Sequence, residues 1–276
     1  MKFISSSNDL SVYLDLNIAK GIPIKNISID TRTIKKDSLF IAIKGDKFDG
    51  NDFVQEAFEK GASLAIADNK KFLKIRNKKI VYVKNTIGAL KKISENIIKK
   101  YGGNVIAITG SNGKTTTTNI IANSLNNTSK TIGNYNNEIG MPLSIINASP
   151  KSKNIIIEIG AAKAGDIDYL SRILNPFIGV ITNIGNSHLE TLKNINGVLK
   201  VKSEIVNNIK KGGYLIVPNE NKKHLSYWKL IRDDINIYSF GMTKSADFFA
   251  RDIRVKKEGM HFKISSKLIE KDIKIK

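Results

Sequence analysis

Residues 104–118 read NVIAITGSNGKTTTT, and the rest of the chain is organised around this stretch. An apolar run rich in β-branched residues leads into a turn bracketed by Gly110 and Gly113, and Lys114 and four threonines follow. A strand, a glycine-rich turn and a Lys-Thr pair at the start of a helix are typical of a phosphate-binding loop. The usual pattern, G-x-x-x-x-G-K-[ST], needs glycine at position 108, which is isoleucine here, so the predicted loop is a shortened form.

Each residue type in this loop has a chemical reason to be there. Backbone N–H groups of the turn and of the helix N-terminus attract anionic oxygens, and the helix dipole favours negative charge. We expect the two glycines to let the backbone approach the phosphates, Lys114 to reach the terminal phosphates, and the Thr115 hydroxyl to bind Mg²⁺. The predicted nucleotide-binding residues are Gly110, Ser111, Asn112, Gly113, Lys114, Thr115 and Thr116. The alternative is a turn that binds nothing.

The composition narrows the class of protein. A length of 276 residues suggests two domains, and the absence of cysteine excludes disulfides and cysteine-based metal sites. No apolar run is long enough to cross a bilayer, and the N-terminus lacks the pattern of a signal peptide. We therefore expect a cytoplasmic protein that does not insert into membranes.

The net charge of +20 raises the question of nucleic-acid binding. The excess lysines are spread along the whole chain, and aromatic residues are not interleaved with them as a base-stacking surface requires. We therefore expect a solvated basic surface and no nucleic-acid partner.

Residues 1–85 are predicted to form a small α/β domain. Short apolar runs alternate with turn signals, and a helix at 52–60 is expected between Asp52 as its N-cap and Gly61 as its C-cap. Four strands are predicted in this domain: one that begins at residue 27 and runs into a turn by residue 32, and three at residues 38–43, 62–67 and 79–83.

Residues 86–276 are predicted to form the second domain, with a helix at 86–101 as the connector. Apolar strands alternate with helices, which predicts a doubly wound, mostly parallel sheet around the phosphate loop. The expected strands are 105–108, 153–159, 178–183, 214–217 and 236–240, and the expected helices are 119–126, 166–174 and 195–209. From residue 247 the apolar positions alternate, which predicts an antiparallel β extension with a turn at residues 258–259.

Three segments outside the loop carry candidate functional residues. Glu158 ends a buried strand, where a carboxylate suits Mg²⁺, although it could instead cap a neighbouring loop. His188, with Glu190 nearby, follows the next strand and could bind metal, orient a phosphate or be structural. Asn136 and Asn137 lie between glycines on a segment that could fold over the nucleotide or form a turn-rich surface loop.

Taken together, these motifs resemble the Mur ligases of peptidoglycan synthesis. Within the family, NNEIGMP and the EIGA segment are most similar to the members that add D-alanyl-D-alanine to UDP-N-acetylmuramoyl-tripeptide. The alternatives are a member that extends the UDP-N-acetylmuramoyl-dipeptide, a folylpolyglutamate-type ligase, and a catalytically incomplete nucleotide-binding module. The matching stretches are SIDTR (28–32), LFIAIKGDKFDGNDFV (39–54), GSNGKTTTT (110–118), NYNNEIGMPLS (134–144), EIGAAKAGDI (158–167), TNIGNSHLE (182–190) and KVKSEI (200–205).

The resemblance implies an ATP- and Mg²⁺-dependent ligase. The γ-phosphate of ATP would pass to a substrate carboxylate, and the amine of D-alanyl-D-alanine would attack the acyl phosphate. Lys114 and the loop amides would hold the phosphates, Thr115 and Glu158 one Mg²⁺, and Glu158 with His188 a second. A family lysine carbamylated to bind metal corresponds to Lys202, with Lys200 as the nearby competitor.

The resemblance also assigns the substrate contacts. Asn137, beside Asn136, would face the γ-phosphate and the acyl end. The UDP part would bind to the first domain near Thr31, Arg32, Lys44 and Gly45.

Family members continue into a third domain that contacts the amine substrate and closes over ATP, preceded by an Asn-containing adenine-binding segment. Neither is recognisable in these 276 residues, so we expect a fragment or a truncated gene product. We expect a monomer that binds nucleotide without completing the ligation.

Overall fold

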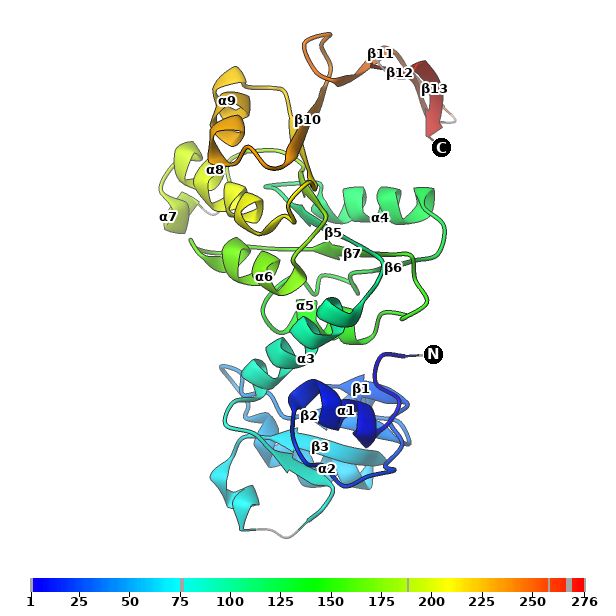
Figure 1. Ribbon diagram of the computed structural model, residues 1–276, viewed down its shortest axis with the longest axis vertical. Helices are drawn as coiled ribbons and strands as arrows, with labels where there is room; N and C mark the ends of the chain where they lie inside the picture. The colour runs from blue at the N-terminus through cyan, green and yellow to red at the C-terminus, as the bar shows by residue number, and fades with distance from the viewer. Residues whose placement is uncertain (1, 75–76, 188, 258, 267–269, 276) are drawn as a thin grey trace. The chain divides into compact units, whose positions relative to one another are not determined.

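The computed structural model of the protein describes residues 2–74, 77–187, 189–257, 259–266 and 270–275 (Figure 1). Two compact units make up the chain. The first contains Met1–Gly103 and Asn126–Ile155, and the second contains Asn104–Leu125 and Ile156–Lys276. None of the helices formed by the described residues combines the length and the apolar composition that a bilayer crossing requires.

The first unit is built on a four-stranded parallel sheet, blue to cyan in Figure 1. Its strands follow one another in chain order: β1 (Asn26–Ser28), β2 (Ser38–Ile41), β3 (Ala62–Ala67) and β4 (Ile80–Tyr82). All four predicted strands are confirmed. β3 is buried along nearly its whole length, as its apolar sequence requires.

The predicted helix at 52–60 begins differently from the expectation. A 3-10 turn, Gly50–Phe53, precedes helix α2 (Val54–Glu59), and Asp49 caps the turn in place of Asp52. The Asp49 carboxylate accepts hydrogen bonds from the backbone N–H and the side-chain amide of the buried Asn51. Lys60 is the C-cap of α2, and Gly61 follows it with φ +105°, a conformation that favours glycine.

The remaining elements of the first unit include two helices that the sequence did not predict. These helices are α1 (Ser7–Leu14) and α5 (Gly140–Ile146). The short strand β6 (Thr128–Lys130) was not predicted either. The predicted connector is confirmed as α3 (Thr86–Lys100), which packs against both α1 and α5. Two further 3-10 turns are Thr31–Thr33 and Lys70–Leu73.

The larger sheet contains the strand that feeds the phosphate loop. Its nine strands are ordered β13-β12-β11-β10-β9-β8-β5-β7-β6. The strands β8, β9, β10 and β11 pair in parallel from one to the next, and β5 pairs in parallel with β8. Strands β11, β12 and β13 pair antiparallel, so the predicted parallel sheet with an antiparallel extension is confirmed. The strand bounds are β5 (Asn104–Thr109), β7 (Asn154–Glu158), β8 (Ile178–Ile181), β9 (Tyr214–Pro218), β10 (Asn236–Gly241), β11 (Phe248–Lys256), β12 (Gly259–Ser266) and β13 (Glu270–Ile275).

The helices of the second unit agree partly with the predicted pattern. Helix α6 (Asp166–Leu174) has the predicted bounds, and the expected helix at 195–209 is α8 (Ile195–Ser203) followed by a 3-10 turn, Glu204–Asn208. Helix α4 (Lys114–Ser124) begins at the loop lysine, five residues earlier than predicted. The short α7 (Leu189–Leu192) and α9 (Lys222–Ile231) were not predicted.

Trp228 fastens α9 to the end of α8. Its side chain is fully buried, and its indole N–H donates to the Ser203 hydroxyl at 2.7 Å. That hydroxyl donates in turn to the Leu199 carbonyl at 2.6 Å. The chain of bonds leaves no polar group of this cluster without a partner, which is the condition for burying it.

We predict that Trp228→Ala lowers the free energy of unfolding by about 3–5 kcal/mol, because it leaves a large cavity and removes the hydrogen bond that the indole donates to Ser203. Leu230→Ala on the same helix is the control, since that leucine is 85% exposed. Its effect should stay within about 0.5 kcal/mol. Urea unfolding of both variants checks the prediction, and equal losses in the two would contradict it.

Candidate active site

The structure contains the predicted strand, turn and helix of the phosphate loop. Gly113 is the N-cap of α4, with φ +76°, and the first N–H bonded within the helix is that of Thr117, to the Gly113 carbonyl at 2.9 Å. The Lys114 ammonium donates to the carbonyls of Gly110 (3.1 Å) and Ser111 (3.4 Å) and so lies over the loop. Helix geometry leaves the N–H groups of the first turn without carbonyl partners inside the helix, which makes this end suited to an anion.

The two glycines of the loop have different roles. A Cβ at Gly113 would meet nothing within 4 Å, so the space beside it is open to a ligand. A Cβ at Gly110 would lie 1.9 Å from the Thr182 hydroxyl, and this glycine also has φ +146°. The Thr182 side chain therefore takes the space beside Gly110, and the approach of phosphate to this glycine stays a prediction.

Two of the loop amides are already bonded to the protein. The N–H of Ser111 donates to the Asn183 carbonyl at 3.2 Å, and that of Asn112 donates to the Asn183 side-chain oxygen at 2.9 Å. The N–H groups that remain for phosphate are those at the start of α4, including Lys114, Thr115 and Thr116. The loop therefore has fewer N–H groups left to bind a phosphate than the sequence suggested.

Thr115 and Glu158 lie together beside the loop. The Thr115 hydroxyl donates to a Glu158 carboxylate oxygen at 2.7 Å, and Glu158, at the end of β7, is only 3% exposed. A hydroxyl and a carboxylate are hard oxygen ligands of the kind that Mg²⁺ prefers. This pair fits the metal that the sequence predicted for it.

Lys202 is a buried lysine whose charge interacts with that of Lys114 in the loop. The side chain, on α8, is 1% exposed, and burial together with the nearby charge of Lys114 lowers its pKa to about 8. Glu204 and Asp166 act in the opposite direction. Lys200, the competitor, is exposed on the same helix, and His188 lies outside the described residues.

The asparagines of the 133–142 segment belong to the first unit. The Asn137 side-chain oxygen accepts hydrogen bonds from the N–H groups of Ile139 (3.3 Å) and Gly140 (2.8 Å), at the start of α5. Asn137 is exposed and Asn136 half-buried. Asn137 thus shapes the turn in which both lie.

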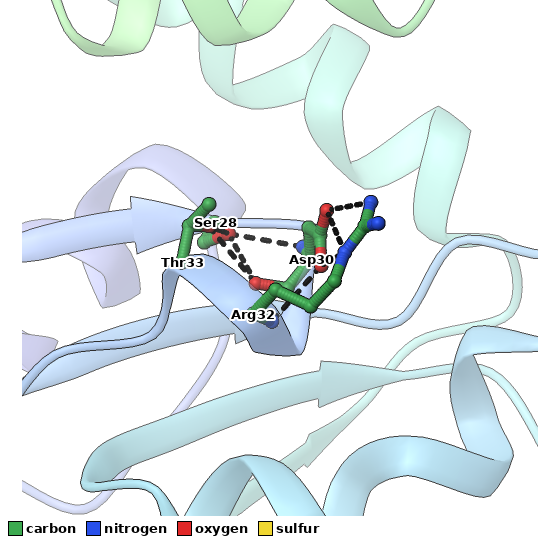
Figure 2. A network of polar contacts seen from close by, with 4 residues as sticks. All are labelled: Ser28, Asp30, Arg32 and Thr33. Carbon is green, nitrogen blue, oxygen red and sulfur yellow. Dashed lines mark hydrogen bonds and ion pairs between the residues drawn. The ribbon is translucent and has the colours of Figure 1, made fainter.

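The predicted UDP contacts follow the carboxyl ends of two adjacent parallel strands. After β1, the Asp30 carboxylate accepts from the N–H and from the guanidinium of Arg32, and this interaction lowers the pKa of Asp30 (Figure 2). The Ser28 hydroxyl bonds to Thr33 and to the Asp30 backbone in the same turn. After β2, the backbones of Lys44 and Asp49 form an isolated antiparallel β-bridge, and the Gly45 N–H donates to the Phe48 carbonyl. Thr31 opens the turn that holds Arg32, whose side chain is 84% exposed.

Sequence reasoning gave no role to three residues that shape the site. The Thr182 hydroxyl donates to the Asn112 carbonyl, and the Asn183 oxygens accept from two N–H groups of the loop. The Glu204 carboxylate accepts from the N–H groups of Gly165 and Asp168, which fastens the start of α6 to the end of α8. All three lie inside stretches singled out by the resemblance, but that signal does not distinguish them from their neighbours.

Comparisons with known proteins identify the family of this chain. Residues 108–276 match the Mur ligase middle domain, and residues 23–100 match the Mur ligase family catalytic domain. The chain therefore belongs to the Mur ligase family.

Three similar proteins show how far the match extends. The UDP-N-acetylmuramoyl-tripeptide–D-alanyl-D-alanine ligase of Bacillus subtilis (strain 168) is 35% identical over 87% of this chain and 52% of its own length. The MurF crystal structure from Acinetobacter baumannii has a TM-score of 0.85 at 28% identity, covering 96% of this chain and 59% of that one. The MurF ligase from Thermotoga maritima in complex with ADP has a TM-score of 0.79 at 27% identity, covering 90% and 57%. The chain spans about half the length of the curated relatives it matches.

We predict a pH range in which the titration of Lys202 changes the free energy of unfolding. Folding lowers the lysine pKa from 10.5 to about 8, so between these values the unfolded chain binds the extra proton. The free energy of unfolding of the wild type should therefore rise relative to that of Lys202→Met from about pH 8 to pH 10.5. Denaturant titrations in carbon-dioxide-free buffer test this, with Lys200→Met as the exposed control; parallel pH curves for wild type and Lys202→Met would contradict it.

Proposed function

We propose that this chain belongs to an ATP-dependent ligase that joins D-alanyl-D-alanine to UDP-N-acetylmuramoyl-tripeptide through an acyl phosphate, in the synthesis of peptidoglycan. The observation that carries the proposal is the phosphate loop with the Thr115–Glu158 pair beside it. The chain that contains them is similar to UDP-N-acetylmuramoyl-tripeptide–D-alanyl-D-alanine ligases. We propose that the reaction takes place in the cytoplasm and that the protein is a monomer that binds no nucleic acid.

The reaction depends on holding and neutralising phosphate charge. The N–H groups at the start of α4 and the Lys114 ammonium would bind the terminal phosphates of ATP. Thr115 and Glu158 would hold Mg²⁺, which supplies charge neutralisation for phosphoryl transfer when it is bound. The protein's own contribution is positioning and electrostatics, and no covalent nucleophile is required.

Lys202 would complete the site as a carbamate. Its neutral amine would attack the carbon of CO₂ and release a proton, which gives an N-linked carboxylate. At pH 7.5 a lysine of pKa about 8 is roughly one-quarter neutral, against about one in a thousand at the ordinary value. The negative carbamate would be attracted to the Lys114 ammonium, which repels the protonated amine of Lys202. Together with Glu158 and His188, the carbamate would form a second metal site.

The first unit would bind the acceptor substrate. Thr31 and Arg32 after β1, and Lys44 and Gly45 after β2, place two cationic side chains at one edge of a parallel sheet, where ligands commonly bind. These are the groups expected to contact the UDP part. Asn136 and Asn137 would act at the acyl end.

We expect ATP and UDP-N-acetylmuramoyl-tripeptide to bind separately to the wild-type chain in calorimetric titrations. Lys114→Ala should weaken ATP binding by roughly tenfold or more, because it removes a charge-assisted contact to phosphate, and should leave the UDP substrate unaffected. Lys151→Ala, an exposed lysine, is the control. Binding of ATP alone would favour the incomplete nucleotide-binding module, and tighter binding of UDP-N-acetylmuramoyl-dipeptide would favour the dipeptide-extending member.

Carbamylation has a direct spectroscopic test. With ¹³C-labelled bicarbonate, the wild type should show a carbamate carbon resonance by NMR that disappears in Lys202→Ala and persists in Lys200→Ala. The buried, partly neutral amine of Lys202 is the physical reason. A resonance that survives in Lys202→Ala and vanishes in Lys200→Ala would move the assignment to the competitor.

A further inference from the structure

Residues 182–187, which we call the β8 loop, surround the phosphate loop with hydrogen bonds. The Thr182 hydroxyl donates to the Asn112 carbonyl at 2.6 Å, and the Asn183 oxygens accept from the N–H groups of Ser111 and Asn112. The Ser111 hydroxyl donates to the Gly185 carbonyl at 2.9 Å and accepts from the Gly185 N–H at 3.0 Å. Ser187 donates to the same hydroxyl at 2.9 Å.

These bonds fix both peptide groups on either side of Asn112. Its N–H is bonded to Asn183 and its carbonyl to Thr182, so the orientation of the next peptide unit, which leads to Gly113, is set. Thr182 can approach this closely only because Gly110 has no Cβ. A loop with glycines at both ends would otherwise sample many conformations.

We propose that Asn183, with Thr182, is a positioning residue that holds the phosphate loop in its ligand-binding conformation before any phosphate arrives. Part of the conformational entropy that a glycine-rich loop loses on closing around an anion is then already lost in the free protein. Because two of the loop amides are bonded to Asn183, the N–H groups at the start of α4 are those left for the anion. The expected effect on nucleotide affinity rests on the proposed function, whereas the expected effect on the conformation of the loop does not.

Four variants separate this role from a general loss of structure. Asn183→Ala removes the acceptor for the Asn112 N–H, and Thr182→Val removes the hydroxyl while keeping the shape of the side chain. Thr182→Ser restores the hydroxyl. Asn186→Ala, at an exposed asparagine of the same loop, is the matched control.

The first measurement needs no nucleotide. Hydrogen exchange of the Asn112 amide, followed by NMR in the whole chain, should be roughly tenfold faster in Asn183→Ala than in the wild type or in Asn186→Ala. Unchanged exchange in Asn183→Ala would overturn the proposal whether or not the protein binds ATP.

The second measurement is calorimetric titration with ADP and with inorganic triphosphate, in Mg²⁺, well below the melting temperature. Asn183→Ala and Thr182→Val should bind both ligands roughly five- to tenfold more weakly, by the same factor for each, whereas Thr182→Ser and Asn186→Ala should bind as the wild type does. Wild-type affinity in Asn183→Ala would overturn the proposal. A wild type that binds neither ligand would instead defeat the proposed function, and the exchange result would still decide the role of Asn183.

Discussion

The structure of the site depends on one close contact, in which the Thr182 hydroxyl occupies the space that a Cβ would fill at Gly110 and donates to the Asn112 carbonyl. The parallel pairing of β5 with β8 brings the ends of these two strands together, so the segments that follow them must pack against each other. Glycine at position 110 is what permits that packing. The phosphate loop is therefore a joint product of two strand ends, and its geometry is not a property of the loop sequence alone.

Charge is the second constraint on the site. The charge of Lys114 disfavours the protonated form of Lys202, and Lys202 is almost fully buried. Glu204 and Asp166 compensate this charge only in part, and a buried cation that is partly compensated costs free energy in the folded state. Groups with pKa values shifted in this way are concentrated at functional sites. An added anion, whether a phosphate or a carbamate on Lys202, would relieve this cost.

The elements that could be predicted from the sequence are those whose apolar pattern matches a single local geometry. β3, α3 and α6 have such patterns, and they appear with bounds close or identical to those expected. The helix α5 was missed because every one of its residues is buried, so it has no polar face to reveal a helical period. The start of α4 was misplaced because threonines are poor helix formers, and here Gly113 and the packing of the loop override that preference.

The sequence by itself determined that the chain has a phosphate loop, that Glu158 follows a buried strand, and that the surrounding motifs resemble the Mur ligases. Those conclusions need only spacing and residue type, which are local properties of the chain. Only the tertiary structure decided that Glu158 meets Thr115, that Lys202 is buried while Lys200 is exposed, and that Asn183 takes two of the loop amides. The physical reason is that the Thr115–Glu158 and Asn112–Asn183 bonds join residues 43 and 71 positions apart in the chain, whose proximity is created by the order of strands in the sheet.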